Sequence, residues 1–250
     1  MKKSLILFLS IFYGLFNLCH QSKTQLPIPT STRQLVVVIT PSLESSRGKL
    51  MRFERAEEQQ GWKPYSDNMS VIVGKRGLAR GRGLHHLDEN TFPLKQEGDR
   101  KSPAGAFTLG PAFGYRPAEE IGELKFPYQQ VKEGWECIDD VNSRYYNHLI
   151  QRNEVEPKDW QSSERMFSSG IWYELGVVIN HNTDSVLAGA GSCIFLHNWS
   201  DPADSTTGCT AMDRSDLKRI IQWLDEAKNP VLVQLSLDLY RRYQKSWKLP

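Results

Sequence analysis

Short apolar runs that end at proline or glycine constrain the fold of this chain most. Two clear examples are residues 35–39, closed by Pro41, and residues 70–73, closed by Gly74. Runs of this length, rich in valine and isoleucine, are typical of buried strands rather than helices. Similar runs predict further strands at 106–109, 176–179, 192–197 and 231–235. Before residue 106 we expect a turn at Ser102–Gly105, because proline presets φ and glycine tolerates positive φ.

One stretch near the C-terminus has helical periodicity instead. Leu217, Ile220, Ile221 and Leu224 share one helix face, and Asp213 is placed to cap the N-terminus. Between residues 143 and 166 the pattern loosens into polar residues with scattered aromatics, which favours an irregular, partly helical segment. The sequence therefore predicts one mainly β (α+β) domain with a few peripheral helices.

The first 22 residues have the order of an export signal. Lys2 and Lys3 precede an uncharged apolar run from Leu5 to Leu18. Such a run is short for a membrane span but suits the apolar region of a signal peptide, the alternative being a buried core helix. We predict a signal peptide at 1–22, a linker at 23–33 and a folded domain at 34–250.

Cys19 offers a second interpretation of the same segment, as a lipid-attachment cysteine, although Leu18 before it is bulkier than such sites usually tolerate. Under either interpretation the protein is exported, to the periplasm or cell envelope. Its contact with the membrane would then be limited to the signal peptide or to a lipid anchor at Cys19.

The charge balance argues against a nucleic-acid partner. Of 31 lysines and arginines, Lys2 and Lys3 leave with the predicted signal peptide, so 29 basic residues face 29 acidic ones. Binding to a phosphate backbone depends on an excess of positive charge, which this chain lacks. The basic run at residues 75–82 lacks the order of a phosphate-binding loop and is typical of a solvated, glycine-rich loop.

Three cysteines remain after the predicted processing: Cys137, Cys193 and Cys209. An odd number in an oxidising compartment leaves at least one thiol unpaired, which indicates either a reactive or a deeply buried cysteine. Cys137 and Cys193 are able to pair, but the sequence does not decide whether they do.

The residues best suited to chemistry lie near the end of the predicted strand at 192–197 and just after it. Strand alternation puts Cys193 and His197 on one face, and a polar loop then leads to Gly208 and Cys209. A histidine beside a thiol can take its proton and so generate the thiolate, which is the nucleophile. Backbone N–H groups at Gly208 and Cys209 would then stabilise an oxyanion.

Two other interpretations of these residues stay open. A buried cysteine and a hydrogen-bonded core histidine are common fates of these residue types. A zinc site built from His197, Cys209 and Cys193 is the second, although no C-x-x-C pair supports it.

The same stretch resembles the active-site signature of the L,D-transpeptidase catalytic domain, also called the YkuD-like domain. That signature is a histidine, a variable loop and then Ser/Thr-x-Gly-Cys, and His197, Thr206, Gly208 and Cys209 match it. The resemblance is closest to a branch with a short loop and spans roughly residues 34–235. Recurrent segments of that branch resemble residues 97–105, 135–140, 143–147 and 180–182.

The resemblance implies a β-sandwich-like catalytic domain over residues 34–250, with Cys209 as nucleophile and His197 as base. Family enzymes attack the carbonyl before the terminal D-residue of a peptidoglycan stem peptide and form a thioester, which an amine or water resolves. This implies a role in cell-wall biogenesis and cell shape, with no metal or organic cofactor. Thr207 and Ala211 depart from the commoner signature, which has histidine and arginine there.

The remaining candidates are for substrate binding: Thr206, Thr207, His181 and Asn182. For His181 and Asn182 the alternative is a polar cluster that stabilises a turn. Asp139 and Asp140 could form an acid–base pair, but we favour a structural or amine-binding role because cysteine chemistry needs no carboxylate pair.

Two rival functions also remain. An L,D-carboxypeptidase or amidase would hydrolyse stem peptides with the same site, and a non-catalytic cell-wall-binding module would have kept only the fold.

Overall fold

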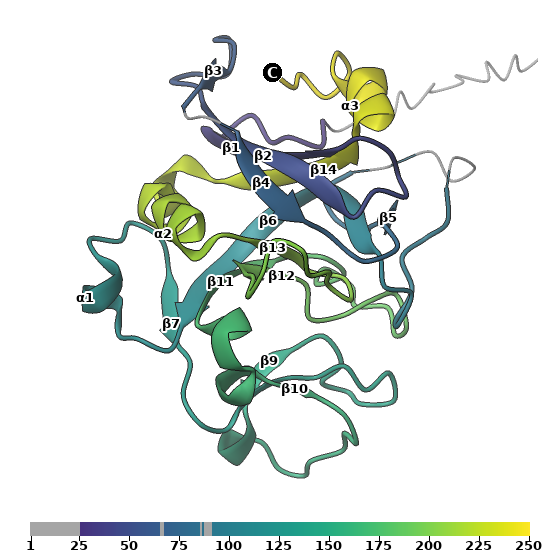
Figure 1. The fold of residues 1–250 in the computed structure, drawn as a ribbon, viewed down its shortest axis with the longest axis vertical. Helices are drawn as coiled ribbons and strands as arrows, with labels where there is room; N and C mark the ends of the chain where they lie inside the picture. Colours follow the sequence, from purple (N-terminus) through teal and green to yellow (C-terminus); the bar gives the residue numbers. More distant parts are fainter. Residues whose placement is uncertain (1–25, 66–67, 86, 88–91) are drawn as a thin grey trace, which may run out of the picture.

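The computed structural model describes residues 26–65, 68–85, 87 and 92–250 (Figure 1). The predicted signal peptide and Cys19 lie outside these residues. Within the described part, no helix is long and apolar enough to cross a membrane. Residues 26–33, predicted as linker, contact the fold, because Ile28 is 4% exposed and belongs to the core.

A large sheet dominates the described residues. Its strands are β1 (Gln34–Thr40), β2 (Arg47–Glu54), β3 (Lys63–Pro64), β4 (Met69–Ile72), β5 (Leu78–Arg80), β6 (Ser102–Gly114), β7 (Tyr128–Gln130), β11 (Leu175–Ile179), β12 (Phe195–Asn198), β13 (Thr210–Met212) and β14 (Val231–Ser236). The pairing order β1-β14-β6-β11-β12-β13-β4-β2 returns to its start, since β2 also pairs with β1. The sheet therefore closes into a ring, which leaves few edges exposed.

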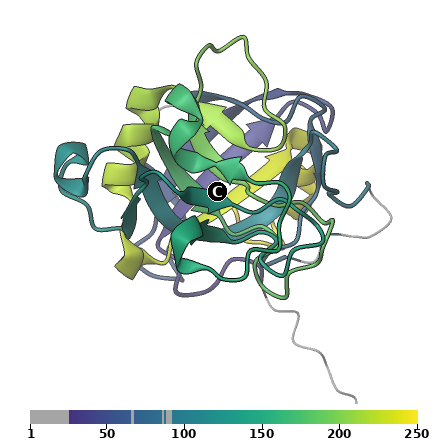
Figure 2. The same cartoon turned by 90° about the horizontal axis from the view of Figure 1, so that it is seen from below.

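A second, three-stranded sheet lies at the lower end of the molecule in Figure 1. It consists of β8 (Trp135–Cys137), β9 (Leu149–Gln151) and β10 (Glu164–Arg165). Three 3₁₀ turns accompany it: η1 (Arg152–Glu154), η2 (Met166–Ser168) and η3 (Gly170–Tyr173). The view from below shows this part lying across the large sheet (Figure 2). A disulfide between Cys137 and Cys193 ties β8 to the segment before β12.

Few helices complete the fold: α1 (Ala118–Ile121), α2 (Arg214–Trp223), α3 (Leu237–Tyr243) and the 3₁₀ turn η4 (Glu226–Lys228). Helix α2 confirms the predicted amphipathic helix, because Leu217, Ile220 and Ile221 are buried. Its N-cap is Asp213, whose carboxylate accepts hydrogen bonds from the backbone of Ser215 and Asp216. The prediction of a mainly β fold is confirmed.

The main core is formed by strands of the ring together with the buried faces of α2 and α3. In β1 the valines and leucine at residues 35–38 are fully buried, and they pair in parallel register with β14 from Val231 onward. Burial on both faces explains why residues 35–38 and 231–233 are continuously apolar rather than alternating. A smaller cluster joins the two sheets and includes Met166, Tyr173, Phe195 and Cys209.

Two local predictions are wrong. Ser102–Gly105 is not a turn but the start of β6, held by β5 and β14; Gly105 has a φ of 146°, and a side chain there would meet the ring of His85. The strand predicted at 192–197 begins only at Phe195, because Cys193 has a φ of 54° and is bonded to Cys137.

Candidate active site

Cys209 and His197 line the same cavity, of about 330 Å³. Both are mostly buried, each 7% exposed. The wall residues come from β12, β13, the loop between them, β4, β10 and the segment around η3. They are Ile72, Glu164, Ser169, Trp172, Tyr173, His197, Trp199, Asp204, Ser205, Thr206, Thr207, Cys209 and Ala211.

Strand pairing explains why these two side chains line one cavity. β12 and β13 are parallel neighbours, with His197 opposite Ala211, and Cys209 immediately precedes β13. Cys209 lies two residues before Ala211, so alternation directs it to the face that carries His197. With ordinary strand spacing, their Cα atoms are roughly 8 Å apart, a distance that two converging side chains can bridge.

His197 is held in one tautomer. Its Nδ1 lies 2.8 Å from the backbone oxygen of Asn198. A carbonyl oxygen only accepts hydrogen bonds, so Nδ1 carries the proton and Nε2 keeps its lone pair. Burial lowers the pKa of His197 to about 4, against a smaller opposing effect of that hydrogen bond. At neutral pH the ring is therefore uncharged and able to act as a base.

The Cys209 thiol is the free cysteine among the described residues. Its Sγ accepts from the backbone N–H of Phe195 at 3.3 Å and lies 3.4 Å from the backbone oxygen of Cys193, to which it donates. Burial raises the pKa of Cys209 well above its usual range, and Glu164 raises it further. The Phe195 N–H and Lys95 act in the opposite direction. The resting thiol is therefore protonated.

The backbone at Cys209 is fixed by two hydroxyl groups. Thr206 Oγ1 donates to the carbonyl oxygen of Cys209 at 2.6 Å, and Ser102 Oγ donates to the same oxygen at 2.9 Å. Ser102 Oγ in turn accepts from the backbone N–H of Gly74. Thr206 thus both lines the cavity and anchors the loop, while Thr207 lines the cavity beside it.

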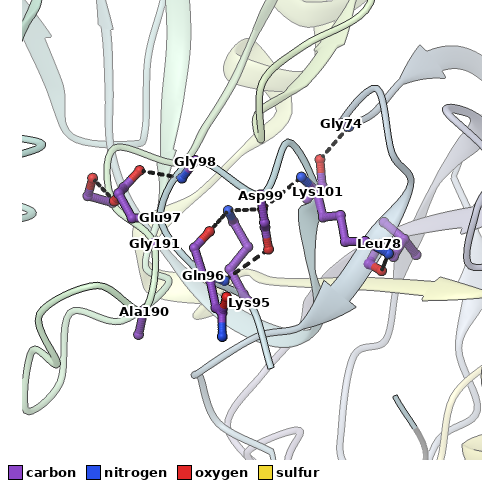
Figure 3. A network of polar contacts seen from close by, with 12 residues as sticks. Gly74, Leu78, Lys95, Gln96, Glu97, Gly98, Asp99, Lys101, Ala190 and Gly191 are labelled. Atoms are coloured by element: carbon purple, nitrogen blue, oxygen red, sulfur yellow. Dashed lines mark hydrogen bonds and ion pairs between the residues drawn. The ribbon is translucent and has the colours of Figure 1, made fainter. Parts of the chain in front are cut away.

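Lys95 is a buried cation that acts electrostatically on Cys209 and that no sequence motif indicated. It is 2% exposed, and its Nζ contacts the Asp99 carboxylate at 2.6 Å and the Gln96 carbonyl at 2.9 Å (Figure 3). Asp99 also accepts from the backbone N–H groups of Gln96 and Lys101. This network positions a positive charge that favours the thiolate of Cys209.

Gly191 leaves room for the Lys95 side chain, whereas a side chain at Gly208 would be in ordinary contact with it. A Cβ at Gly191 would lie 2.9 Å from its Cγ, and a Cβ at Gly208 would lie 3.8 Å from its Cε and 3.3 Å from Ile194 Cδ1. Gly191 also has a φ of 94°, which other residues rarely adopt. These contacts relate the glycines of the signature region to the packing of Lys95.

Glu164 and Tyr173 were also not singled out from the sequence. Glu164 lies in β10, lines the cavity and accepts a hydrogen bond from the Tyr173 hydroxyl. The Tyr173 ring packs edge-on against His197, with 5.4 Å between ring centroids. The sequence signals were weak, because Glu164 sits in a polar stretch and Tyr173 in an irregular one.

His181 and Asn182 are not among the residues that line this cavity. His181 is 1% exposed, its Nε2 lies 2.9 Å from the Ala190 oxygen, and its Nδ1 accepts from the backbone of Arg82. The Asn182 side chain bonds the backbone of Leu187 in both directions. A substrate-binding role for these two residues stays a prediction.

Asp139 and Asp140 have different surroundings. Asp140 accepts hydrogen bonds from the backbone N–H groups of Asn142 and Gln161, which lower its pKa. Asp139 Oδ1 is buried and has no hydrogen-bond partner among the described residues. Asp140 thus stabilises its turn, whereas Asp139 Oδ1 has no such hydrogen bond among the described residues.

The disulfide answers the question that the sequence left open, since Cys137 and Cys193 are bonded. The bonded sulfur of Cys193 has no thiolate to offer a metal, so the alternative of a zinc site with His197, Cys209 and Cys193 is wrong.

A comparison with models of protein families matches residues 44–233 to one of them, described as the L,D-transpeptidase catalytic domain (YkuD). No curated protein and no solved structure matches the chain.

Proposed function

Since this chain belongs to the L,D-transpeptidase catalytic domain family, we propose that it is an exported enzyme that acylates Cys209 with a peptidoglycan stem peptide. The observation that supports this most is a free thiol and an uncharged imidazole on the wall of one cavity. The acyl group then passes to an amine of a second stem.

In the first half-reaction the Cys209 sulfur attacks the carbonyl carbon while its proton passes to Nε2 of His197. The new C–S bond forms, and the backbone N–H groups of Gly208 and Cys209 stabilise the oxyanion. The C–N bond then breaks, and His197 returns the proton to the departing amine. The product is a thioester on Cys209.

In the second half-reaction the acceptor amine gives its proton to His197 and attacks the thioester carbon. The C–S bond breaks, and the thiolate that leaves recovers the proton from His197. Water in place of the amine would give hydrolysis by the same steps.

One rearrangement is required before the first step. The resting thiol donates to the Cys193 oxygen, and no hydrogen bond links it to His197 in the part of the chain that the structure describes. Rotation about the Cα–Cβ bond of Cys209 turns the sulfur from that oxygen toward the imidazole. Because the thiol pKa is raised and the imidazole pKa lowered, we expect proton transfer to accompany attack rather than precede it.

The test is incubation of the purified protein with muropeptides, with products weighed by mass spectrometry beside a Cys209→Ala control. A joined dimer supports transfer, and a stem shortened without a dimer shows an L,D-carboxypeptidase instead. If neither product forms with the wild-type protein, the chain is a wall-binding module or has another substrate.

A further inference from the structure

The wall of the Cys209 cavity carries an acidic side chain that the proposed chemistry does not use. Glu164 is the first residue of β10, and it pairs with Cys137 of β8. It therefore belongs to the small sheet, yet it lines the cavity together with Cys209 and His197. The disulfide from Cys137 to Cys193 fixes this strand pair against the segment before β12.

The hydrogen-bond partner of Glu164 is a neutral group. The Tyr173 hydroxyl donates to Glu164 Oε2, and no basic side chain pairs with the carboxylate among the described residues. Lys95, the cation that favours the thiolate of Cys209, is paired with Asp99 at 2.6 Å. Among the residues that the structure describes, the Glu164 carboxylate thus has no counter-charge paired with it.

The other charges around Glu164 have the same sign. Asp139, which follows β8, and Glu97, from the segment before β6, both act on it electrostatically. Within the described ranges, Asp139 Oδ1 is buried without a hydrogen-bond partner, and Glu97 accepts hydrogen bonds from neutral groups, including Tyr146 and Ser192. Like charges gathered in a partly closed site disfavour the ionised state unless a cation joins them.

We propose that Glu164, supported by the negative potential of Asp139, binds a primary ammonium group of the stem peptide beside Cys209. This inference rests on the proposed function and names the substrate feature that the site selects. An ammonium is a compact cation with three donors, able to meet the oxygens of Glu164 that Tyr173 leaves free. A diamino-acid side chain is the chemical class that supplies it.

The aromatic wall suits this ligand. Trp172, Tyr173 and Trp199 line the same cavity and give it apolar surface, although Trp172 is itself 51% exposed. The Tyr173 ring also contacts His197, so an ammonium at Glu164 would place the peptide next to the base.

Ionisation of Glu164 sets the expected pH dependence. Burial of its carboxyl group raises the pKa of Glu164 to about 7, the Tyr173 hydrogen bond opposes this, and Asp139 and Glu97 add to it. Cys209, His197 and Asp204 face the same cavity, and burial keeps the first two uncharged near neutral pH. Affinity for the ammonium should therefore rise between pH 6 and pH 8, as Glu164 loses its proton.

The test compares two synthetic stem peptides, one with a free side-chain amine on a diamino acid and one with that amine acetylated. Binding is measured by calorimetry in a Cys209→Ala background, where neither peptide is consumed. We expect the free amine to bind at least about tenfold more tightly at pH 8, as for a buried charged hydrogen bond. With Glu164→Gln the two peptides should bind within about twofold of each other.

Two further variants serve as controls. Glu154→Gln removes an exposed acidic residue of η1, beside the same small sheet, and should keep the preference for the free amine. Glu164→Asp retains the charge and should restore part of the preference, which a purely structural role of Glu164 would not predict. An undiminished preference in Glu164→Gln, or no measurable binding of either peptide, overturns the inference.

The same peptides given to the protein with Cys209 intact separate this inference from the proposed function. Turnover of both peptides at equal rates would support the proposed function and contradict the ammonium site. Absence of turnover combined with amine-dependent binding would support the ammonium site and contradict the proposed function.

Discussion

The ring of Tyr173 stands edge-on to the imidazole of His197, with 5.4 Å between centroids and 87° between planes. Tyr173 comes from η3 beside the small sheet, and His197 comes from β12 of the large one. The contact therefore crosses the junction of the two sheets, and it adds to the Asn198 hydrogen bond in holding the proposed base. Mutation of Tyr173 tests this junction directly.

Tyr173→Ala should lower the free energy of unfolding by about 3–5 kcal/mol, because it empties a buried aromatic site that also packs on Phe113 and Phe195. Tyr173→Phe keeps the ring contacts and loses only the hydroxyl, at about 1 kcal/mol. Urea unfolding of both variants measures the difference. Equal losses would show that the ring packing contributes nothing beyond the hydroxyl.

Glu164→Gln should change how stability depends on pH. The folded pKa of Glu164 is raised to about 7 from 4.5, so the native state binds the proton more tightly than the unfolded state. The stabilisation that Glu164 gives the native state by binding this proton is complete below about pH 4.5 and is lost as the pH rises through 7. The free energy of unfolding of the variant, taken relative to that of wild type, should thus be higher at pH 8 than at pH 5 by roughly 1–3 kcal/mol. Thermal unfolding at both pH values checks this, and a gain that is the same at pH 5 and 8 would contradict it.

Lys95→Met should make the Cys209 thiol harder to ionise, since a nearby positive charge is removed. We expect iodoacetamide labelling of the native protein to slow and its pH midpoint to move upward. Because Lys95→Met also leaves the Asp99 carboxylate without its ion-pair partner, Lys95→Arg is the matched control that keeps a cation. Labelling profiles that coincide for wild type and Lys95→Met would show that Lys95 does not act on the thiol.

Joint replacement of Cys137 and Cys193 by serine should destabilise the protein by up to about 4 kcal/mol, given the 56-residue separation of the bridge. The Cys193 oxygen, which holds the resting thiol, would also lose its anchor. Urea unfolding with and without a reducing agent measures the first effect, and reductant should affect the wild-type protein alone. Sensitivity of the double variant to reductant would contradict this assignment.

Much of the fold followed from local pattern, and the exceptions have physical causes. The runs at 35–39 and 231–233 are apolar because both faces of β1 and β14 are buried, and the spacing around Leu217 identified α2. The start of β6 resembled a turn, since Pro103 and Gly105 are local turn formers, but pairing with β5 and β14 outweighs that preference.

The candidate site was predictable only where a short stretch of chain contains it. His197 and Cys209 lie close in sequence and on paired strands, so spacing was informative. Lys95, Glu164 and Tyr173 reach the site from separate segments through long-range packing, which a single sequence does not reveal. The bond between Cys137 and Cys193 likewise depends on the approach of the two sheets.

The most direct test of the account is the mass of the intact protein after brief incubation with a stem peptide and quenching in acid. Wild-type protein should gain the mass of the acyl fragment, and peptide mapping should place it on Cys209 as a thioester, while Cys209→Ala gains nothing and His197→Ala gains it far more slowly. An adduct on another residue, or turnover that persists in Cys209→Ala, would contradict the assignment of Cys209 as the nucleophile.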